Sequence, residues 1–271
     1  MSFFRTEPGP GSWKRALGIV AIIILAIAFL CLFYVCPGRV TPILMYHSIS
    51  DKANNSLCVT PQNFAEQIRF LHERGYSVIS LDALVQELKK GRRYLPATVV
   101  ITFDDGFEDN FIHAFPVLAK YNMPATIFLI TGYVNGREGY LGWDQVSLMS
   151  KNGIDLGGHT RNNVYLPSVT DERVLWDEVA GSKKDIEEHT GEEAGYFCYP
   201  TGGFNGKVKN AVKLAGYKGA CTTNRGSDRP AVDVYELKRI KVTNSDMNKP
   251  FHFRAKLSGF YNFFRRARSG D

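Results

Sequence analysis

From residue 40 onward, short apolar runs alternate with amphipathic stretches along the chain. Uninterrupted apolar runs of a few residues indicate buried strands, and apolar residues spaced three or four positions apart indicate helices. The expected strands are residues 42–46, 77–79, 98–103, 125–129, 155–157, 195–199, 219–222 and 239–242. The expected helices are residues 61–74, 82–90, 112–121, 143–151, 171–190 and 206–215.

The alternation of these strands and helices predicts an α/β fold in which a parallel sheet closes into a (β/α) barrel. The sequence contains neither a glycine-rich dinucleotide loop nor a P-loop, which argues against a doubly wound nucleotide-binding domain. No internal repeat or low-complexity linker divides the alternating region, so we expect one domain over residues 37–244. Barrel enzymes place their chemistry at the carboxyl ends of strands, so polar residues at those positions are the candidates for function.

An uncharged apolar run, ALGIVAIIILAIAFLCLFYVC, occupies residues 16–36. As a helix it would extend about 31 Å, the thickness of a hydrocarbon core. No small-residue cleavage pattern follows it, which favours an uncleaved signal anchor over a removed signal peptide. The run is preceded by the basic residues Arg5, Lys14 and Arg15. The positive-inside rule therefore places residues 1–15 in the cytoplasm and residues 37–271 on the periplasmic or extracellular side. A buried core helix is the alternative, which the apolar character of every face disfavours.

The net charge of +6 arises at the two ends of the chain. Residues 1–15 carry three basic side chains and one acidic, residues 245–271 carry six and two, and the remainder is balanced. A nucleic-acid-binding domain gathers basic residues on one face of its folded part, so nucleic acid is not an expected partner. Residues 245–271 are expected to form a basic, aromatic C-terminal tail that lies against anionic lipid or packs on the barrel.

Cysteines give little support to a metal knuckle or a disulfide framework. Cys58, Cys198 and Cys221 lie in the expected domain without CxxC spacing. Buried free thiols are the simpler interpretation, and one disulfide among the three is the alternative.

Two adjacent carboxylates end one of the predicted strands, in the run ATVVITFDDGF at residues 97–107. Asp104 and Asp105 carry like charges side by side, which costs free energy unless a cation or a shared proton relieves it. A bound metal ion is the simplest relief. A helix cap in a solvated turn is the alternative interpretation of such a pair.

Two further polar clusters follow predicted strands. In IDLGGHTRNNVYLP, residues 154–167, His159 comes just after a strand, where an imidazole can serve as a metal ligand or as a buried structural group. In GYFCYPTGGFN, residues 195–205, a strand enters a turn rich in proline and glycine. Free backbone N–H groups in that turn would bind an anion, although by itself the pattern indicates only a turn.

Together, and in this order, these segments resemble the polysaccharide deacetylase superfamily. The resemblance covers residues 41–244 and depends on ILMYHS, ITFDDGF, GIDLGGHT, FCYPTG and LKRIKV. It implies a distorted (β/α) barrel that hydrolyses N-acetyl groups of a glycan. The LMYH opening and the RIKV ending are similar to the branch that contains deacetylases of exported poly-N-acetylglucosamine.

The resemblance implies a role for each member of the first two clusters. Asp104 would be the general base and Asp105 a ligand of a divalent metal, with zinc the expected ion. The family has two histidine ligands four residues apart, and here His159 is present while Asn163 stands at the second position. An amide oxygen is a weaker zinc donor than imidazole, so the site would bind zinc loosely, prefer a harder ion, or bind none. Asn162 is adjacent but has the wrong spacing.

Two further departures from the family pattern affect the remaining roles. Cys198 stands where many members have an arginine that orients the base, and Arg239 of the RIKV segment is the expected substitute. His47, which ends the LMYH strand, is the expected general acid, because this branch has its acid motif at the N-terminus. A core histidine is the alternative for His47, and His252 is the next candidate acid.

The resemblance also implies how the substrate is held. The oxyanion would be stabilised by the metal and by a backbone N–H near Tyr199, in the turn that continues through Pro200 and Gly202. Sugar rings could stack on three aromatic side chains that are equally well explained as core residues, namely Trp143, Tyr165 and Phe204. Asp144 is expected to cap the helix that starts beside it.

The function predicted from the sequence is that of a membrane-anchored, metal-dependent hydrolase. It would remove N-acetyl groups from a polysaccharide or cell-envelope glycan that contains N-acetylglucosamine. Two alternatives remain open: a carbohydrate-binding pseudoenzyme weakened by the Asn163 change, and a deacylase of lipid-linked sugars or peptidoglycan.

Overall fold

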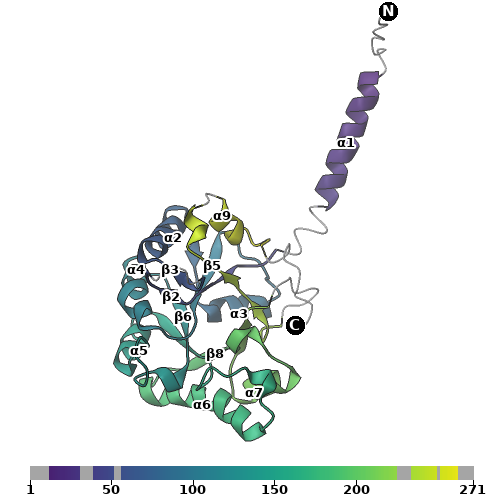
Figure 1. The fold of residues 1–271 in the computed structure, drawn as a ribbon. Coiled ribbons are helices and arrows are strands. Elements are labelled where there is room, and N and C mark those ends of the chain that lie inside the picture. The colour runs from purple at the N-terminus through teal and green to yellow at the C-terminus, as the bar shows by residue number, and fades with distance from the viewer. Residues whose placement is uncertain (1–11, 31–38, 52–55, 225–232, 249–250, 262–271) are drawn as a thin grey trace, which may run out of the picture. The chain divides into compact units, whose positions relative to one another are not determined.

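The computed structural model describes residues 12–30, 39–51, 56–224, 233–248 and 251–261, and the chain forms two compact units (Figure 1). The first unit is Met1–Arg39 and the second is Val40–Asp271. The second unit contains the sheet and every candidate site residue.

The first unit contains helix α1, Ser12–Leu30. Its apolar side chains are exposed, with Leu17 at 68% and Leu25 at 68% of full exposure. Residues 31–36 of the expected membrane span lie outside the described residues. Among the helices that the structure describes, none combines the length and the apolar character needed to span a bilayer.

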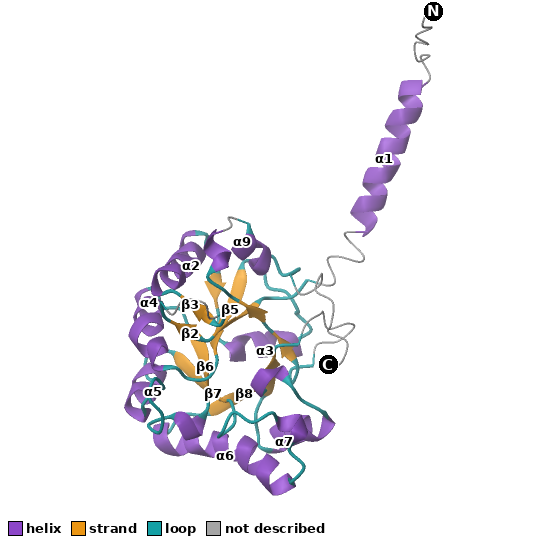
Figure 2. Cartoon of the chain, viewed as in Figure 1, coloured by secondary structure: helices purple, strands orange, loops and turns teal. Residues whose placement is uncertain are grey.

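In the second unit, parallel strands form one continuous path with helices packed around them (Figure 2). The path runs in the order β10-β9-β8-β7-β6-β5-β1-β11. These strands are β1 (Ile43–Tyr46), β5 (Thr98–Phe103), β6 (Ala125–Leu129), β7 (Ile154–Gly158), β8 (Ala194–Cys198), β9 (Gly219–Thr222), β10 (Leu237–Lys238) and β11 (Ile240–Lys241). Nearly all of their residues are buried, as a sheet covered on both faces requires.

The path is nearly closed, because its two end strands are consecutive in the chain. β10 pairs with β9, β11 pairs with β1, and only Arg239 separates β10 from β11. The segment predicted as one strand, residues 239–242, is thus part of a split strand that joins both edges of the sheet. The predicted parallel barrel is confirmed, and its seam lies at Arg239.

The strand predicted at residues 77–79 does not form a stave of the barrel. It is β4, Ser77–Val78, which pairs with Thr98 and Val99 at the start of β5. A second small sheet, absent from the prediction, joins β2 (Ser48–Ile49) to β3 (Cys58–Val59). Both of its strands have two residues, too few for a periodic signal.

The helices packed around the strands begin and end close to the predicted residues. They are α2 (Pro61–Glu73), α3 (Leu81–Lys89), α4 (Phe115–Lys120), α5 (Trp143–Ser150), α6 (Glu172–Thr190) and α7 (Gly206–Leu214). Side-chain oxygens of Thr60, Ser80, Asp171 and Asn205 each accept a backbone N–H in a first turn, which explains where these helices start.

The helix predicted over residues 112–121 is divided. A π-helical turn, Asn110–Ala114, precedes α4, and Pro116 lies in the first turn of α4. Proline lacks an N–H and its ring crowds the carbonyl of the fourth residue before it, so a regular α-helix cannot continue through this position.

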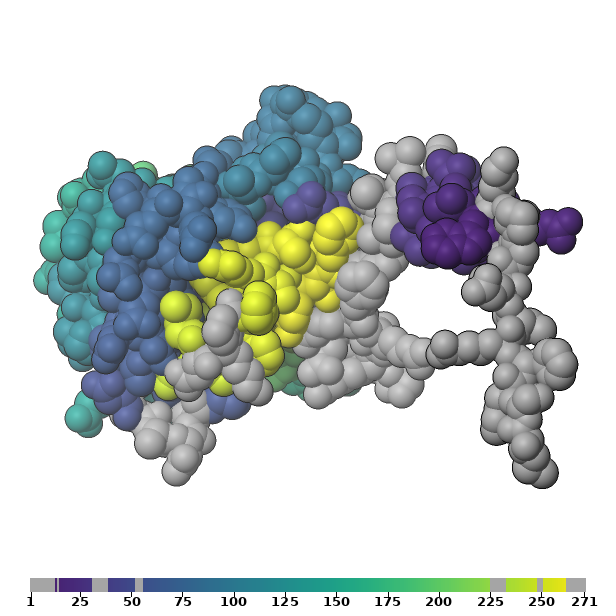
Figure 3. All heavy atoms as spheres, turned by 90° about the horizontal axis from the view of Figure 1, so that it is seen from above, coloured from purple at the N-terminus to yellow at the C-terminus, as the bar shows by residue number. Residues whose placement is uncertain are grey.

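Two short helices follow the barrel, α8 (Ser245–Asn248) and α9 (His252–Leu257). Phe253 and Leu257 of α9 are buried in the main core, and the Phe253 ring lies 5.8 Å from that of Phe70 on α2. Figure 3 shows the described C-terminal residues, in yellow, lying against the blue N-terminal part of the second unit. The compact unit therefore continues into the segment expected to form a separate tail, and residues 262–271 of that tail lie outside the described part.

Candidate active site

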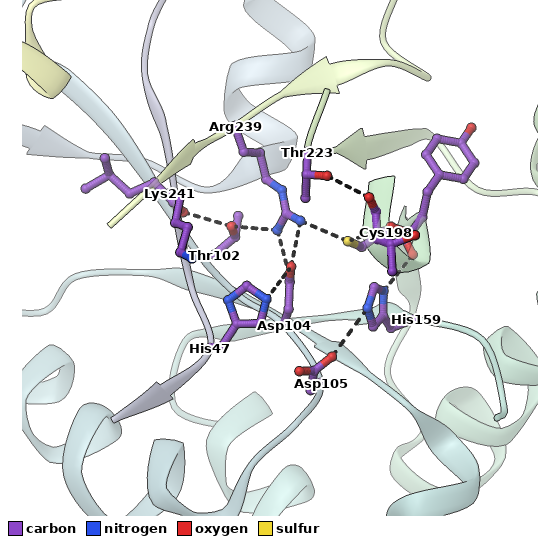
Figure 4. A network of polar contacts seen from close by, with 12 residues as sticks. His47, Thr102, Asp104, Asp105, His159, Cys198, Thr223, Arg239 and Lys241 are labelled. Atoms are coloured by element: carbon purple, nitrogen blue, oxygen red, sulfur yellow. Dashed lines mark hydrogen bonds and ion pairs between the residues drawn. The ribbon is translucent and has the colours of Figure 1, made fainter. Parts of the chain in front are cut away.

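Polar side chains from several strands meet at one rim of the barrel (Figure 4). Asp104 and Asp105 follow β5, His47 follows β1, and His159 follows β7. Because the strands are parallel, their carboxyl ends lie on the same rim. Arg239 reaches this group from the seam between β10 and β11.

Asp104 and Arg239 form a buried bidentate ion pair. Arg239 Nη1 donates to Asp104 Oδ1 at 2.6 Å, and Nη2 donates to Oδ2 at 2.7 Å. The exposed fractions of the two side chains are 3% for Asp104 and 0% for Arg239. Burial alone would raise the pKa of Asp104, but the guanidinium outweighs it and holds that pKa at about 2. The carboxylate is therefore ionised and oriented, as a general base must be.

Arg239 also contacts the residue that stands in place of the expected arginine. Its Nη2 donates to Cys198 Sγ at 3.0 Å, and its Nη1 donates to Thr102 Oγ1 at 3.1 Å. The guanidinium beside Asp104 is therefore supplied by Arg239, at the seam between β10 and β11. The small side chain of Cys198 leaves room for it. The structure brings Arg239 to the base, as the sequence led us to expect.

His47 lies on the other side of Asp104. Its Nε2 is 3.7 Å from Asp104 Oδ2, and 12% of its side chain is exposed. Burial lowers the pKa of His47 and the Asp104 carboxylate partly offsets this. This placement, beside the base and still accessible to a ligand, differs from that of a histidine packed inside the core.

His159 and Asp105 present two donor atoms to a common point. His159 Nε2 is 3.4 Å from Asp105 Oδ1, and His159 Nδ1 is 2.7 Å from the carbonyl oxygen of Cys198. Two ligands bound tetrahedrally to zinc at about 2.0–2.1 Å lie roughly 3.4 Å apart, so this separation fits a shared metal ion. The carbonyl fixes the proton on Nδ1 and turns Nε2 toward Asp105, a common arrangement for a metal-binding histidine.

The surroundings of His159 favour positive charge at this point. Burial alone would lower the pKa of His159, but Cys198 and the two neighbouring carboxylates raise it well above the ordinary value. A divalent ion held between Asp105 and His159 would supply positive charge at the same point.

The turn after β5 aims Asp105 through an unusual backbone conformation. Asp105 has φ 73° and Gly106 has φ 78°. Glycine is needed at 106 for its conformation, and a Cβ atom there would also lie 2.8 Å from Leu129 Cδ2, so that side chain would have to shift. Strain of this kind at Asp105 is typical of functional turns.

A second group of potential ligand atoms overlaps the first. One donor atom each from Asp104, His159 and Cys198 lie within 4.8 Å of one another, and all three residues are buried. However, Arg239 donates to both oxygens of Asp104 and to the sulfur of Cys198, so a metal ion there would face a guanidinium at close range. We therefore favour the position between Asp105 and His159.

Comparison with known proteins identifies the family of the chain. The polysaccharide deacetylase family model matches residues 92–220. YxkH of Bacillus subtilis, which is named for the same family, is 35% identical over 202 residues, covering 74% of this chain and 71% of its own length. The chain belongs to the polysaccharide deacetylase family. It is a polysaccharide deacetylase, a hydrolase that acts on carbon–nitrogen bonds other than peptide bonds.

Further relatives place the deacetylase within the predicted branch. The poly-β-1,6-N-acetyl-D-glucosamine N-deacetylase of Staphylococcus aureus is 26% identical over 230 residues, covering 80% of this chain and 78% of that protein. Among solved structures, Streptococcus pyogenes deacetylase PplD in complex with acetate superposes with a TM-score of 0.73 at 28% identity, covering 81% of this chain and 98% of that one. IcaB from Ammonifex degensii superposes with a TM-score of 0.68 at 25% identity, covering 79% and 97%.

Asn163 is not joined to the other expected ligands by any contact within the described structure. It is exposed, has φ 56°, and its N–H donates to Thr160 Oγ1 at 2.9 Å. Asn162 is held away from the site, because its Nδ2 donates to Glu178 Oε1 on α6 at 2.7 Å. The donor pair seen in the deacetylase is therefore Asp105 and His159, and the part of Asn163 stays a prediction.

Two backbone N–H groups of the expected oxyanion turn, those of Tyr199 and Gly202, already have hydrogen-bond acceptors. The Tyr199 N–H donates to the Cys221 carbonyl at 3.1 Å, the Gly202 N–H donates to the Tyr199 carbonyl at 2.8 Å, and Pro200 has no N–H. The neighbouring Thr201 has φ 56°, and no hydrogen bond in the described part of the chain uses its N–H. Thr201 is thus the donor that this turn leaves available.

The three candidate sugar-stacking aromatics differ in exposure. Trp143 stacks on His189 at 4.1 Å, and Phe204 stacks on Tyr199 at 4.7 Å, so both have a protein partner on one face. Tyr165 is 52% exposed and remains accessible to a sugar. His252, the alternative acid, lines a cavity of about 360 Å³ beside the Asp246–Lys256 ion pair instead.

Asp144 does not cap the helix beside it. The carboxamide of Asn135 accepts the Trp143 N–H at 2.8 Å, and Gln145 accepts the Gly142 N–H at 2.8 Å. Asp144 lies in the first turn of α5, where a negative charge favours the helix without accepting a cap hydrogen bond.

One polar residue of the site was missed. The Thr102 hydroxyl donates to the Leu44 carbonyl at 2.8 Å and accepts from Arg239 at 3.1 Å, and Thr102 is fully buried. A threonine within the apolar run of β5 was the available signal, because a buried hydroxyl requires partners.

Proposed function

We propose that this deacetylase hydrolyses N-acetyl groups of a glycan that contains N-acetylglucosamine, with help from a divalent metal ion, zinc being the expected one. The observation that carries the proposal is the placement of Asp104 between Arg239 and His47, with Asp105 and His159 beside it. The name of the Staphylococcus aureus relative supports poly-N-acetylglucosamine as the substrate class.

The residues supply complementary proton transfers. Asp104, ionised and held by Arg239, takes a proton from the water that attacks the acetyl carbon. His47, on the opposite side of Asp104, gives a proton to the nitrogen as the carbon–nitrogen bond breaks, so acetate and a free amine leave. A metal held by Asp105 and His159 would contribute Lewis acidity toward the acetyl oxygen.

His47→Ala should distinguish substrates by their leaving groups. We expect the variant to lower kcat/KM for an N-acetylated amide about 10²–10³-fold, because an amine leaves only with a proton. An activated aryl acetate should be slowed by roughly threefold or less, since a phenolate leaves unprotonated. Initial rates of acetate and phenol release from purified residues 37–271 measure both.

The same variant should also change the pH profile. A base that starts ionised and an acid that starts protonated predict a bell-shaped dependence, and His47→Ala should remove its alkaline limb. His72→Ala is the control, because it removes an exposed imidazole on α2 that lies against Tyr121 and leaves His47 in place. Equal slowing of amide and aryl ester by His47→Ala would show that the histidine is structural.

We also propose that residues 16–36 anchor the deacetylase in a membrane, with the barrel on the periplasmic or extracellular side. The uncharged apolar run and the basic residues before it support this topology. A reporter fused after Asp271 should behave as exported, and the same fusion without residues 1–36 should not. Cleavage near Gly38 should release a soluble domain. A cytoplasmic readout from the full-length fusion would overturn the topology.

A further inference from the structure

The turn that follows β5 carries more than the two catalytic carboxylates. Five residues after Asp104, the Asp109 carboxylate reaches back to the segment that follows β1. Its Oδ1 accepts the Ile49 N–H at 2.9 Å, and its Oδ2 accepts the Ser48 hydroxyl at 2.5 Å. One side chain thus binds two consecutive residues directly after His47.

The next residue binds His47 itself. Asn110 is fully buried, and its Nδ2 donates to the His47 carbonyl at 2.8 Å and to Asp109 Oδ1 at 2.9 Å. Asp109 therefore fixes Asn110 as well as the β1 extension.

These contacts begin where the barrel ladder ends. The last sheet bonds of β1 are Val242 N–H to the Met45 carbonyl and Asp104 N–H to the Tyr46 carbonyl, both at 3.0 Å. His47 belongs to neither β1 nor β2, so its backbone is held by side chains of the β5 turn. We call the contacts of Asp109 and Asn110 with residues 47–49 the clamp.

We propose that Asp109 is a positioning residue for His47, keeping its imidazole in place to protonate the leaving amine. The inference rests on the proposed function, because it assumes that His47 is the general acid. Asp109 binds the Ile49 N–H, the Ser48 hydroxyl and the Asn110 side chain, and acts on His47 through them. Its loss should misplace the acid while leaving the base and its arginine unchanged.

Asp109→Ala tests the proposal through the same pair of substrates. A misplacement of about 1 Å can cost about 10²-fold, so we expect that loss in kcat/KM for the amide. The aryl acetate should lose roughly threefold or less, because it needs no acid. Glu108→Gln is the matched control, since Glu108 lies in the same turn and contacts Gln145 rather than the β1 extension.

A double-mutant cycle separates positioning from a general structural role. If Asp109 acts only through His47, Asp109→Ala in the His47→Ala background should slow the amide by roughly threefold or less. Ser48→Ala removes one bond of the clamp from the opposite side and should shift the amide-to-ester ratio in the same direction by a smaller factor. Asp109→Asn keeps an acceptor for the Ile49 N–H and should restore part of the amide rate.

Equal losses on amide and ester, with rates taken per folded molecule, would overturn the proposal and make Asp109 a structural residue. Independent, additive effects of the two alanine substitutions would overturn it too. If His47→Ala itself fails to separate the substrates, the assigned general acid is wrong and this inference falls with it. If His47→Ala separates them and Asp109→Ala does not, the proposed function stands and only the positioning role fails.

Discussion

Arg239→Met should abolish most of the activity and destabilise the barrel at neutral pH. The substitution leaves the buried Asp104 carboxylate without its bidentate partner, and breaking a buried ion pair from one side typically costs about 3–5 kcal/mol. The base also loses its orientation, for which we expect a decrease of about 10²-fold or more in kcat/KM on amide and aryl ester alike. Urea unfolding and initial rates of the two reactions measure the two effects.

The pH dependence of the unfolding free energy shows whether the Asp104–Arg239 ion pair stabilises the fold. In the parent protein the pKa of Asp104 is held at about 2, below its ordinary 3.8, so its stabilising contribution is present above about pH 4 and is lost as the pH falls toward 2. In Arg239→Met, burial without the cation raises the pKa of Asp104. Protonation of Asp104 at low pH therefore removes the unpaired buried charge from the variant. The difference in unfolding free energy between the parent protein and Arg239→Met should therefore become smaller as the pH falls.

Two further variants test whether the loss of stability in Arg239→Met comes from the broken ion pair or from a general disturbance of the fold. Adding Asp104→Asn to Arg239→Met removes the unpaired charge, so the double variant should be more stable than Arg239→Met alone, yet inactive. Arg69→Met on α2 is the matched control, because its guanidinium lies on the surface 3.9 Å from Glu73 and should contribute within about 0.5 kcal/mol. A double variant no more stable than Arg239→Met would contradict the ion-pair explanation.

Asp105→Ala and His159→Ala should each remove bound divalent metal and reduce activity about 10³-fold or more. Both residues contribute a donor atom at the separation that a tetrahedral ion requires, and a site with few protein ligands cannot lose one and still bind tightly. Metal content after dialysis and acetate release with and without added zinc measure the effect. A chelator should inactivate the parent protein in the same way, and added metal should restore it.

Asn163→His is the complementary variant for the same site. Imidazole is a better zinc donor than an amide oxygen, so the substitution should retain or tighten zinc binding. Asn162→His is its control, since the Asn162 side chain is bonded to Glu178. Unchanged metal content after losing both Asp105 and His159 would show that the ion binds elsewhere.

The sequence predicted the individual strands of the barrel well. It did not predict how the segment that closes the barrel is divided between two strands. β5, β6 and β9 occupy the predicted residues, because continuous apolar runs are a local signal. The split of residues 237–241 between two strands has no such signal, since it depends on pairing with β9 and β1, which are distant in the sequence. Local pattern shows that a strand exists, and long-range pairing decides what it joins.

The same distinction separates the site residues. Asp104 and His159 were found because each follows a predicted strand, and parallel strands bring such residues to one rim. His47 was found through the family resemblance. In the oxyanion turn, the acceptor for the Tyr199 N–H is the Cys221 carbonyl, which belongs to another strand and could not be foreseen from the sequence. The contact of Asp109 with the β1 extension was missed for the same reason: the two lie 60 residues apart.

The seam at Arg239 ties the timing of activity to the order of synthesis. The ribosome makes β1, Asp104, Asp105 and His159 early, and Arg239, which pairs with Asp104, enters with the last two strands, β10 and β11. A nascent chain that ends before residue 239 therefore has an open barrel and an unpaired Asp104. Catalysis begins only when β10 and β11 pair with β9 and β1. Activity in a newly made chain therefore shows that the barrel has closed.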